Sequence, residues 1–98
     1  MKLREITAPD GKPVTIRLLP FPPEAQGIGG GTVATAAGFL IAINSNRPRR
    51  DQRRALGHEL AHIWKRHFDR PGEPIEQIER EARRNAARYY RRYALRQL

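Results

Sequence analysis

The chain has 98 residues, a formal net charge of +9 at pH 7 and no cysteine. A chain of this length builds one modest hydrophobic core, so we expect a single domain over residues 1–98. The lack of cysteine excludes disulfides, thiol catalysis and cysteine-ligated zinc, and any metal site must therefore use histidine and carboxylate ligands.

The positive charge comes mainly from arginines that cluster in residues 47–54 and 80–96. They fill helix faces that the apolar positions leave over, which is typical of a solvated surface. Such a charge still permits weak, non-specific binding of nucleic acid. The N-terminus lacks the apolar stretch of a signal peptide, and no apolar run is long enough to span a bilayer. We therefore expect a soluble cytoplasmic protein with no membrane partner.

Strands are predicted in the first half of the chain. From Lys12 to Leu19 apolar residues alternate with polar ones, which is the period-2 pattern of a half-buried strand. The stretch from Gly27 to Gly31 lacks the Gly-Lys-Ser/Thr ending of a phosphate loop, so we interpret it as a flexible lead into a hairpin. That hairpin has one strand at Val33 to Thr35, a turn at residues 36–38 and a return strand at Phe39 to Ile43.

A first helix is predicted from about Pro48 to His67, and Asn44, Ser45 and Asn46 precede it as capping residues. Its apolar positions keep a 4-3-4 spacing and form the stripe that faces the core. This stripe consists of Leu56, Leu60, Ile63 and His67. A histidine at the end of a helix is more often a capping partner than a metal ligand.

A second helix is predicted from Ile75 to roughly Ala94, after a loop at residues 69–74. Steps of 3 and 4 residues define a seam that packs on a neighbouring helix. The seam consists of Ile75, Ile78, Ala82, Asn85, Tyr89 and Tyr93. The expected fold is α+β, with a small antiparallel sheet of about three strands packed on the two helices.

The first helix carries the sequence His58-Glu59-Leu60-Ala61-His62. Residues four apart lie one turn apart on one helix face, so the imidazoles of His58 and His62 can converge on a single metal ion. Glu59 then lies beside the metal without ligating it, where a carboxylate can act as general base. H-E-x-x-H on a helix is a known way to build a zinc site, and two of the three histidines fall within it.

A catalytic zinc site requires a third protein ligand. Glu79 and Glu81 flank the seam of the second helix by equal angles, so periodicity does not choose between them. Two local features favour Glu81. Ala82 beside it allows close helix approach, and Asn85 lies one turn on, where it could orient a ligand histidine.

Residues 43–44, 54–63 and 78–82 together resemble the ImmA/IrrE family of zinc metallopeptidases, as a minimal form within the gluzincin group. The resemblance covers roughly Phe39 to Ala87, and it rests on the H-E-x-x-H sequence followed by Glu-Arg-Glu-Ala. It implies a short β-sheet, zinc ligands at His58, His62 and Glu81, and Glu59 as the base. In place of the Asn-x-Phe-Ala that often ends the family motif, this chain has Arg-Arg-Asn-Ala at residues 83–86.

We therefore expect a zinc-dependent endopeptidase that acts on a peptide or protein substrate, and the resemblance implies a transcriptional repressor as one such substrate. Tyr89 is a candidate oxyanion donor, with a packed core tyrosine as the alternative. An extended peptide could add to the strand from Phe39 to Asn44 if that strand lies at an edge. The alternative function is a non-catalytic zinc-stabilised module that binds nucleic acid or protein through its arginine-rich helices. Glu59 argues against this alternative, because a structural zinc site has no need for a base.

Overall fold

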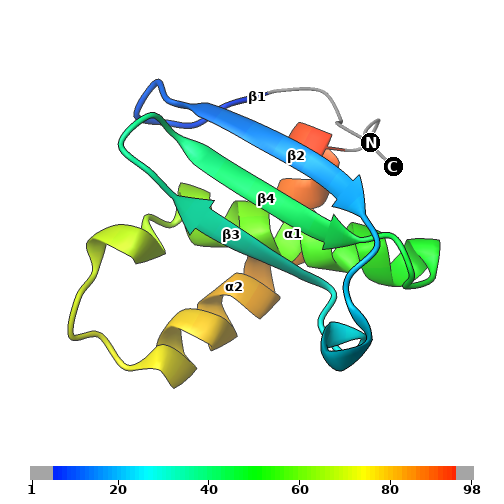
Figure 1. Cartoon of the computed structure of the whole chain (residues 1–98). Helices are drawn as coiled ribbons and strands as arrows, with labels where there is room; N and C mark the ends of the chain where they lie inside the picture. Colours follow the sequence, from blue (N-terminus) through cyan, green and yellow to red (C-terminus); the bar gives the residue numbers. More distant parts are fainter. Residues whose placement is uncertain (1–5, 95–98) are drawn as a thin grey trace.

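The computed structural model describes the backbone of residues 6–94 and the side chains of residues 6–92. Four strands come first, and two helices follow them (Figure 1). The strands are β1 (Ile6–Thr7), β2 (Pro13–Leu19), β3 (Gly30–Ala34) and β4 (Phe39–Asn44), with a 3-10 turn, η1 (Pro23–Ala25), between β2 and β3. The helices are α1 (Arg49–Trp64) and α2 (Ile75–Tyr89), with a 3-10 turn, η2 (His67–Asp69), between them and a π-helical turn, η3 (Tyr90–Ala94), after α2. None of the described helices has both the length and the apolar character that crossing a membrane requires.

The four strands form one sheet in the order β1-β2-β4-β3. The β1–β2 and β3–β4 pairs are antiparallel, whereas β2 and β4 are parallel and place Ile16 opposite Ile41. The α+β class is confirmed, but the sheet is mixed rather than antiparallel and has a fourth strand, β1. The mixed order arises because residues 20–29 carry the chain past the position that β4 later fills, so β4 lies between β2 and β3.

Strand β3 begins earlier than the sequence pattern predicts, and Gly30 and Gly31 belong to it. A Cβ atom on Gly30 would lie 2.9 Å from Cδ1 of Ile43 and 3.0 Å from the carbonyl oxygen of Ala42. A side chain at position 30 would therefore be crowded against β4, which favours glycine there. The glycine-rich stretch is in part an edge strand, and the expectation of a flexible lead is wrong for these two residues.

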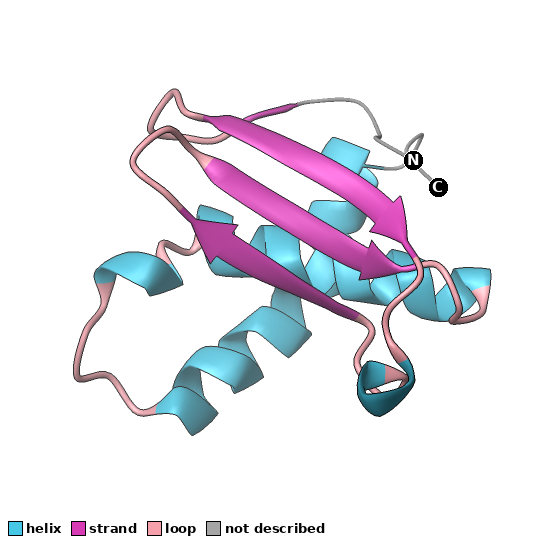
Figure 2. Ribbon diagram, in the orientation of Figure 1, coloured by secondary structure: helices cyan, strands magenta, loops and turns pink. Residues whose placement is uncertain are grey.

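Helix α1 lies across one face of the sheet and α2 packs on α1, so the core lies between that face and the helices (Figure 2). Helix α1 contributes its predicted apolar stripe, and the strands contribute the inward positions of their period-2 pattern. The fully buried side chains of this core include Val14, Ile16, Ile41, Ile43, Leu56 and Leu60. His67 departs from the stripe, because Arg66 adopts a left-handed conformation (φ 59°) after α1 has ended.

Asn44 does not cap α1, contrary to the expectation. The helix begins after Pro48 without a side-chain cap. The fully buried Asn44 side chain accepts hydrogen bonds from the backbone N–H groups of Phe21 (3.2 Å) and Asn46 (3.0 Å) and donates one to the carbonyl of Ile28 (3.0 Å). It thereby fixes the connection between β2 and β3 against the start of α1, and this connection leads directly into the edge strand.

Helix α2 packs on α1 through its C-terminal half. Ala82, Ala86 and Tyr89 are buried, whereas Ile75 at the N-terminal end of the seam is 76% exposed. Figure 1 shows why, since the first turns of α2 project away from the sheet. The side chain of Tyr93, the last predicted seam residue, lies outside the described residues.

The closest approach of the two helices is at Gly57 of α1, because a Cβ atom at this position would collide with the carbonyl oxygen of Ala86. We predict that Gly57→Ala lowers the free energy of unfolding by roughly 1–2 kcal/mol in urea denaturation. Overpacking costs about 1–3 kcal/mol, and a collision with backbone atoms, which cannot rotate away, lies in the upper part of that range, so it outweighs the gain of about 1 kcal/mol in helix propensity. Gly31→Ala is the matched control, since a Cβ atom there has no neighbour within 4 Å. Equal stability of the two variants would contradict the tight helix contact.

Candidate metal centre

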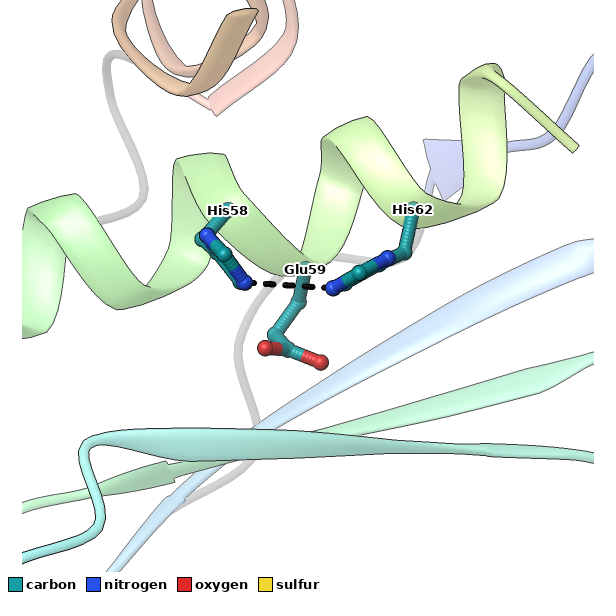
Figure 3. Close-up of side chains that lie close together, drawn as sticks. All are labelled: His58, Glu59 and His62. Atoms are coloured by element: carbon teal, nitrogen blue, oxygen red, sulfur yellow. Dashed lines mark hydrogen bonds between the residues drawn. The ribbon is translucent and has the colours of Figure 1, made fainter. Parts of the chain in front are cut away.

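His58 and His62 lie one turn apart on α1, with their imidazoles side by side (Figure 3). Their Nε2 atoms are 3.1 Å apart. Glu59 lies between them, and its carboxylate points toward the sheet. One potential ligand atom from each of these three residues lies within 4.8 Å of the others, as the H-E-x-x-H sequence predicts.

Glu79 of α2 completes the cluster. Its Oε2 atom lies 2.9 Å from Nε2 of His58, and its Oε1 atom lies 3.2 Å from Nε2 of His62. Zinc bonds of 2.0–2.1 Å to nitrogen and oxygen place neighbouring ligand atoms of a tetrahedral site about 3.3 Å apart. The separations of 2.9, 3.1 and 3.2 Å between the two imidazoles and this carboxylate therefore fit a zinc ion with one open position.

Glu81 points to a different set of partners. Its Oε1 atom lies 3.1 Å from Nη2 of Arg70 and 3.2 Å from Nε2 of His67. The hydrogen bonds from Arg70 lower the pKa of the Glu81 carboxyl, and so hold it as an anion. The structure thus brings Glu79, and not Glu81, to His58 and His62.

In the sequence, the position of Asn85 favoured Glu81 as the third ligand, but Asn85 has a different role in the structure. The amide of Asn85 donates to the backbone carbonyl of Glu81 (2.8 Å), within α2 itself, rather than orienting a ligand histidine. A side chain that bonds to its own helix gives no information about which carboxylate faces α1. The rotation of α2 about its axis decides which carboxylate faces α1, and the packing of α2 on α1 sets this rotation.

Glu59 is buried, with an exposed fraction of 8%. Its Oε1 atom accepts a hydrogen bond from the hydroxyl of Thr32 on β3 (2.7 Å). Burial raises the pKa of the Glu59 carboxyl, and the Thr32 hydrogen bond opposes this rise. A higher pKa makes the carboxylate a stronger base. Sequence reasoning missed Thr32, and the only signal for it was a polar residue within the glycine-rich segment that leads into the hairpin.

Burial also affects His62, because it lowers the pKa of the imidazole. Glu79 acts in the opposite direction, but the effect of burial is larger. The ring is therefore neutral at neutral pH, and the neutral imidazole is the form that binds a metal ion.

The cluster opens into a cleft of about 720 Å³, which is within the usual size range of ligand sites. Helices α1 and α2 form its walls, and the start of β3 forms its rim. The lining residues are Gly29, Gly30, Arg47, Asp51, Arg54, Ala55, His58, Glu59, His62, Glu79, Arg83, Ala86 and Ala87. Tyr89, the candidate oxyanion donor, packs in the hydrophobic core instead and is 8% exposed.

The strand that borders the cleft is β3, which lies at the edge of the sheet, whereas β4 is paired on both sides. The condition for peptide addition to the strand from Phe39 to Asn44 is therefore not met. In a hairpin the sequence does not say which strand is outermost. The parallel β2–β4 pair decides this by enclosing β4.

Comparison with known protein families gives a match that includes the whole cleft. No match was found among curated proteins or solved structures. The peptidase M78 family, described as the IrrE N-terminal-like domain, matches residues 10–90. These residues run from just before β2 to just after α2, and they include the H-E-x-x-H helix and Glu79. The chain therefore belongs to the peptidase M78 family of IrrE N-terminal-like domains.

Proposed function

We propose that the protein is a zinc-dependent endopeptidase in which His58, His62 and Glu79 bind the metal and Glu59 acts as general base. Membership of a metallopeptidase family supports the class of reaction. The observation that carries the proposal is the convergence of three donor groups, 2.9–3.2 Å apart, beside a buried carboxylate. A structural metal site would have no use for that carboxylate.

In the proposed peptide hydrolysis, a bound metal ion and the side chains of the protein would have different roles. A bound zinc ion would polarise the scissile carbonyl and acidify a water molecule in the cleft. Glu59 accepts the proton of that water and later passes it to the leaving nitrogen. Thr32 holds one carboxylate oxygen of Glu59, which leaves the other free for the proton. Burial of Glu59 favours this proton uptake, because it raises the pKa of the carboxyl.

An extended substrate fits the edge of β3. This strand has no neighbour on its outer side within the described sheet, and it runs from the cleft-lining Gly30 to Ala34. Backbone hydrogen bonds to an edge strand bind a peptide without selecting its sequence. The glycine at the start of β3 lets the substrate backbone come close to the H-E-x-x-H helix.

Selectivity comes from two arginines of the cleft. Arg54 lies one helical turn before His58, and Arg83 lies one turn after Glu79, so both are on the helix faces that carry the site. Arg47 pairs with Asp51 (3.0 Å), but Arg54 and Arg83 have no ion pair with any described residue although both line the cleft. We propose that they favour substrates with an acidic residue near the scissile bond. A repressor protein with such a segment is a suitable first substrate.

The ligand set gives the first prediction for the site. Replacing Glu79 with Ala weakens zinc binding by more than roughly 100-fold, because removal of a ligand exceeds the 10- to 100-fold effect of an outer hydrogen-bond partner. Competition with a chromophoric chelator measures the change. Glu76→Ala, on the exposed side of the same helix, is the control and should bind zinc like the wild type. Unchanged affinity in Glu79→Ala would remove this residue from the site.

The role of the base gives a second prediction. Glu59→Gln keeps one zinc ion per chain, because the residue is not a ligand, but lowers kcat for peptide hydrolysis by about 10²- to 10⁴-fold. A peptide library screened by mass spectrometry supplies the substrate for this comparison. Hydrolysis at the same rate in wild type and Glu59→Gln would contradict the proposed mechanism.

A third prediction concerns substrate charge. Peptides that differ only by Glu or Gln near the cleavage site should differ in kcat/KM by roughly 1.4- to 5-fold in favour of Glu, given 0.2–1 kcal/mol per exposed charge pair. The double variant Arg54→Gln/Arg83→Gln should lose this preference. Arg80→Gln/Arg84→Gln removes the same charge from exposed positions outside the cleft and should keep it. A preference that survives in the first variant would show that other groups select the substrate.

A further inference from the structure

A chain of hydrogen-bonding groups extends from His62 away from the metal centre. The Nδ1 atom of His62 lies 2.8 Å from Nδ1 of His67, which belongs to the turn η2. The Nε2 atom of His67 lies 3.2 Å from the Glu81 carboxylate, and Arg70 lies within hydrogen-bond distance of both oxygens of that carboxylate. The side chain of His67 is only 3% exposed, so neither of its nitrogens has free access to water.

The direction of these hydrogen bonds follows from what each group can do. An ionised carboxylate only accepts, so the Glu81 oxygen must accept from an N–H at Nε2 of His67. In the neutral ring Nδ1 of His67 then carries the lone pair, and it accepts from an N–H at Nδ1 of His62. His62 is left with its lone pair on Nε2, the atom that faces His58 and Glu79 and that would bind a metal ion placed between these residues. Without a metal ion, the Glu79 carboxylate favours an N–H at the same atom.

We propose that Arg70, Glu81 and His67 form a positioning relay that fixes the tautomer and the orientation of His62 and thereby sets the metal affinity of the centre. None of the three residues is a ligand or touches the reacting atoms. Metal-bound histidines usually donate their second N–H to a carboxylate or carbonyl, and here an imidazole is interposed. The proposal rests on the metal centre proposed above.

The local backbone is arranged to form this contact. A continued helix would turn residue 67 about 140° away from His62. Arg66 instead takes up the left-handed conformation (φ 59°), and the turn returns His67 to α1, with the two rings 5.0 Å apart at 71° to one another. A non-glycine residue in this conformation has an energetic cost that the surrounding structure must offset. Arg70 contributes to this by donating to the carbonyl of Lys65 at the end of α1 (2.7 Å).

The competing explanation is purely structural, namely that Arg70 and Glu81 fasten the segment between the helices to α2. Such a role would make His67 a space-filling residue. A buried imidazole with polar contacts at both nitrogens is poorly suited to that purpose, because its desolvation has a cost that an apolar side chain avoids. The relay and the structural explanation predict different zinc affinities when the His67 ring is replaced by a side chain that retains only the acceptor.

His67→Phe and His67→Asn test the relay. Phenylalanine fills the space without an acceptor, whereas the Oδ1 atom of asparagine can take the place of Nδ1. We expect zinc affinity, measured by chelator competition, to fall about 10- to 100-fold in His67→Phe and to recover in large part in His67→Asn. Urea denaturation of the metal-free proteins checks that each variant is folded. Wild-type zinc affinity in a stable His67→Phe variant would overturn the proposal, as would equal losses in both variants.

A second measurement does not depend on affinity. Two-bond ¹H–¹⁵N correlation spectra of histidine-labelled protein report which ring nitrogen carries the proton. The relay requires Nδ1–H on His62 and Nε2–H on His67 in the zinc-bound protein. Glu81→Gln should reduce the population of these two tautomers, while Glu76→Gln leaves it unchanged. The opposite tautomer of His62 in the zinc-bound protein would overturn the relay. If the wild type failed to bind zinc, the metal centre would be refuted, while the tautomer of His67 in the metal-free protein would still test the hydrogen bond from His67 to Glu81.

Discussion

The contact between Gly57 of α1 and the backbone of Ala86 on α2 is the constraint on which the candidate site depends. It sets the distance and the rotation of the two helices. His58 follows Gly57 directly, and Glu79 lies two turns before Ala86, so this crossing brings the carboxylate to within 2.9 Å of the imidazole. Leu56 and Leu60 hold the other face of α1 against the sheet. A larger residue at position 57 would push the two helices apart and so move Glu79 away from His58.

The buried polar groups near the candidate metal site each have a hydrogen-bond partner. Glu59 is held by Thr32, and His67 lies between His62 and Glu81. Asn44 satisfies the backbone of the loop that leads to the edge strand. Each buried polar group would be costly without its partner, so each pair fixes one element relative to another. These contacts support the point at the margin of the core where His58, His62 and Glu79 converge.

The sequence alone predicted those parts of the fold and of the site that a local residue pattern determines. The period-2 alternation of β2 and the spacing of Leu56, Leu60 and Ile63 placed the core, and the H-E-x-x-H sequence placed His58, Glu59 and His62. Glu79 could not be chosen from its own helix, because Glu79 and Glu81 are symmetric about the seam and only the crossing of α1 and α2 distinguishes them. The position of His67 depends on a left-handed arginine, which no local pattern indicates. The parallel pairing of β2 with β4 likewise depends on how the chain crosses the sheet.

The most direct test of the account is a crystal structure of the zinc-loaded protein with anomalous diffraction at the zinc absorption edge. We expect one anomalous peak, about 2.0–2.2 Å from Nε2 of His58, Nε2 of His62 and an oxygen of Glu79. Glu81 should remain on Arg70 and His67. A peak bound by Glu81 in place of Glu79, or one away from the two histidines, would contradict the proposed centre.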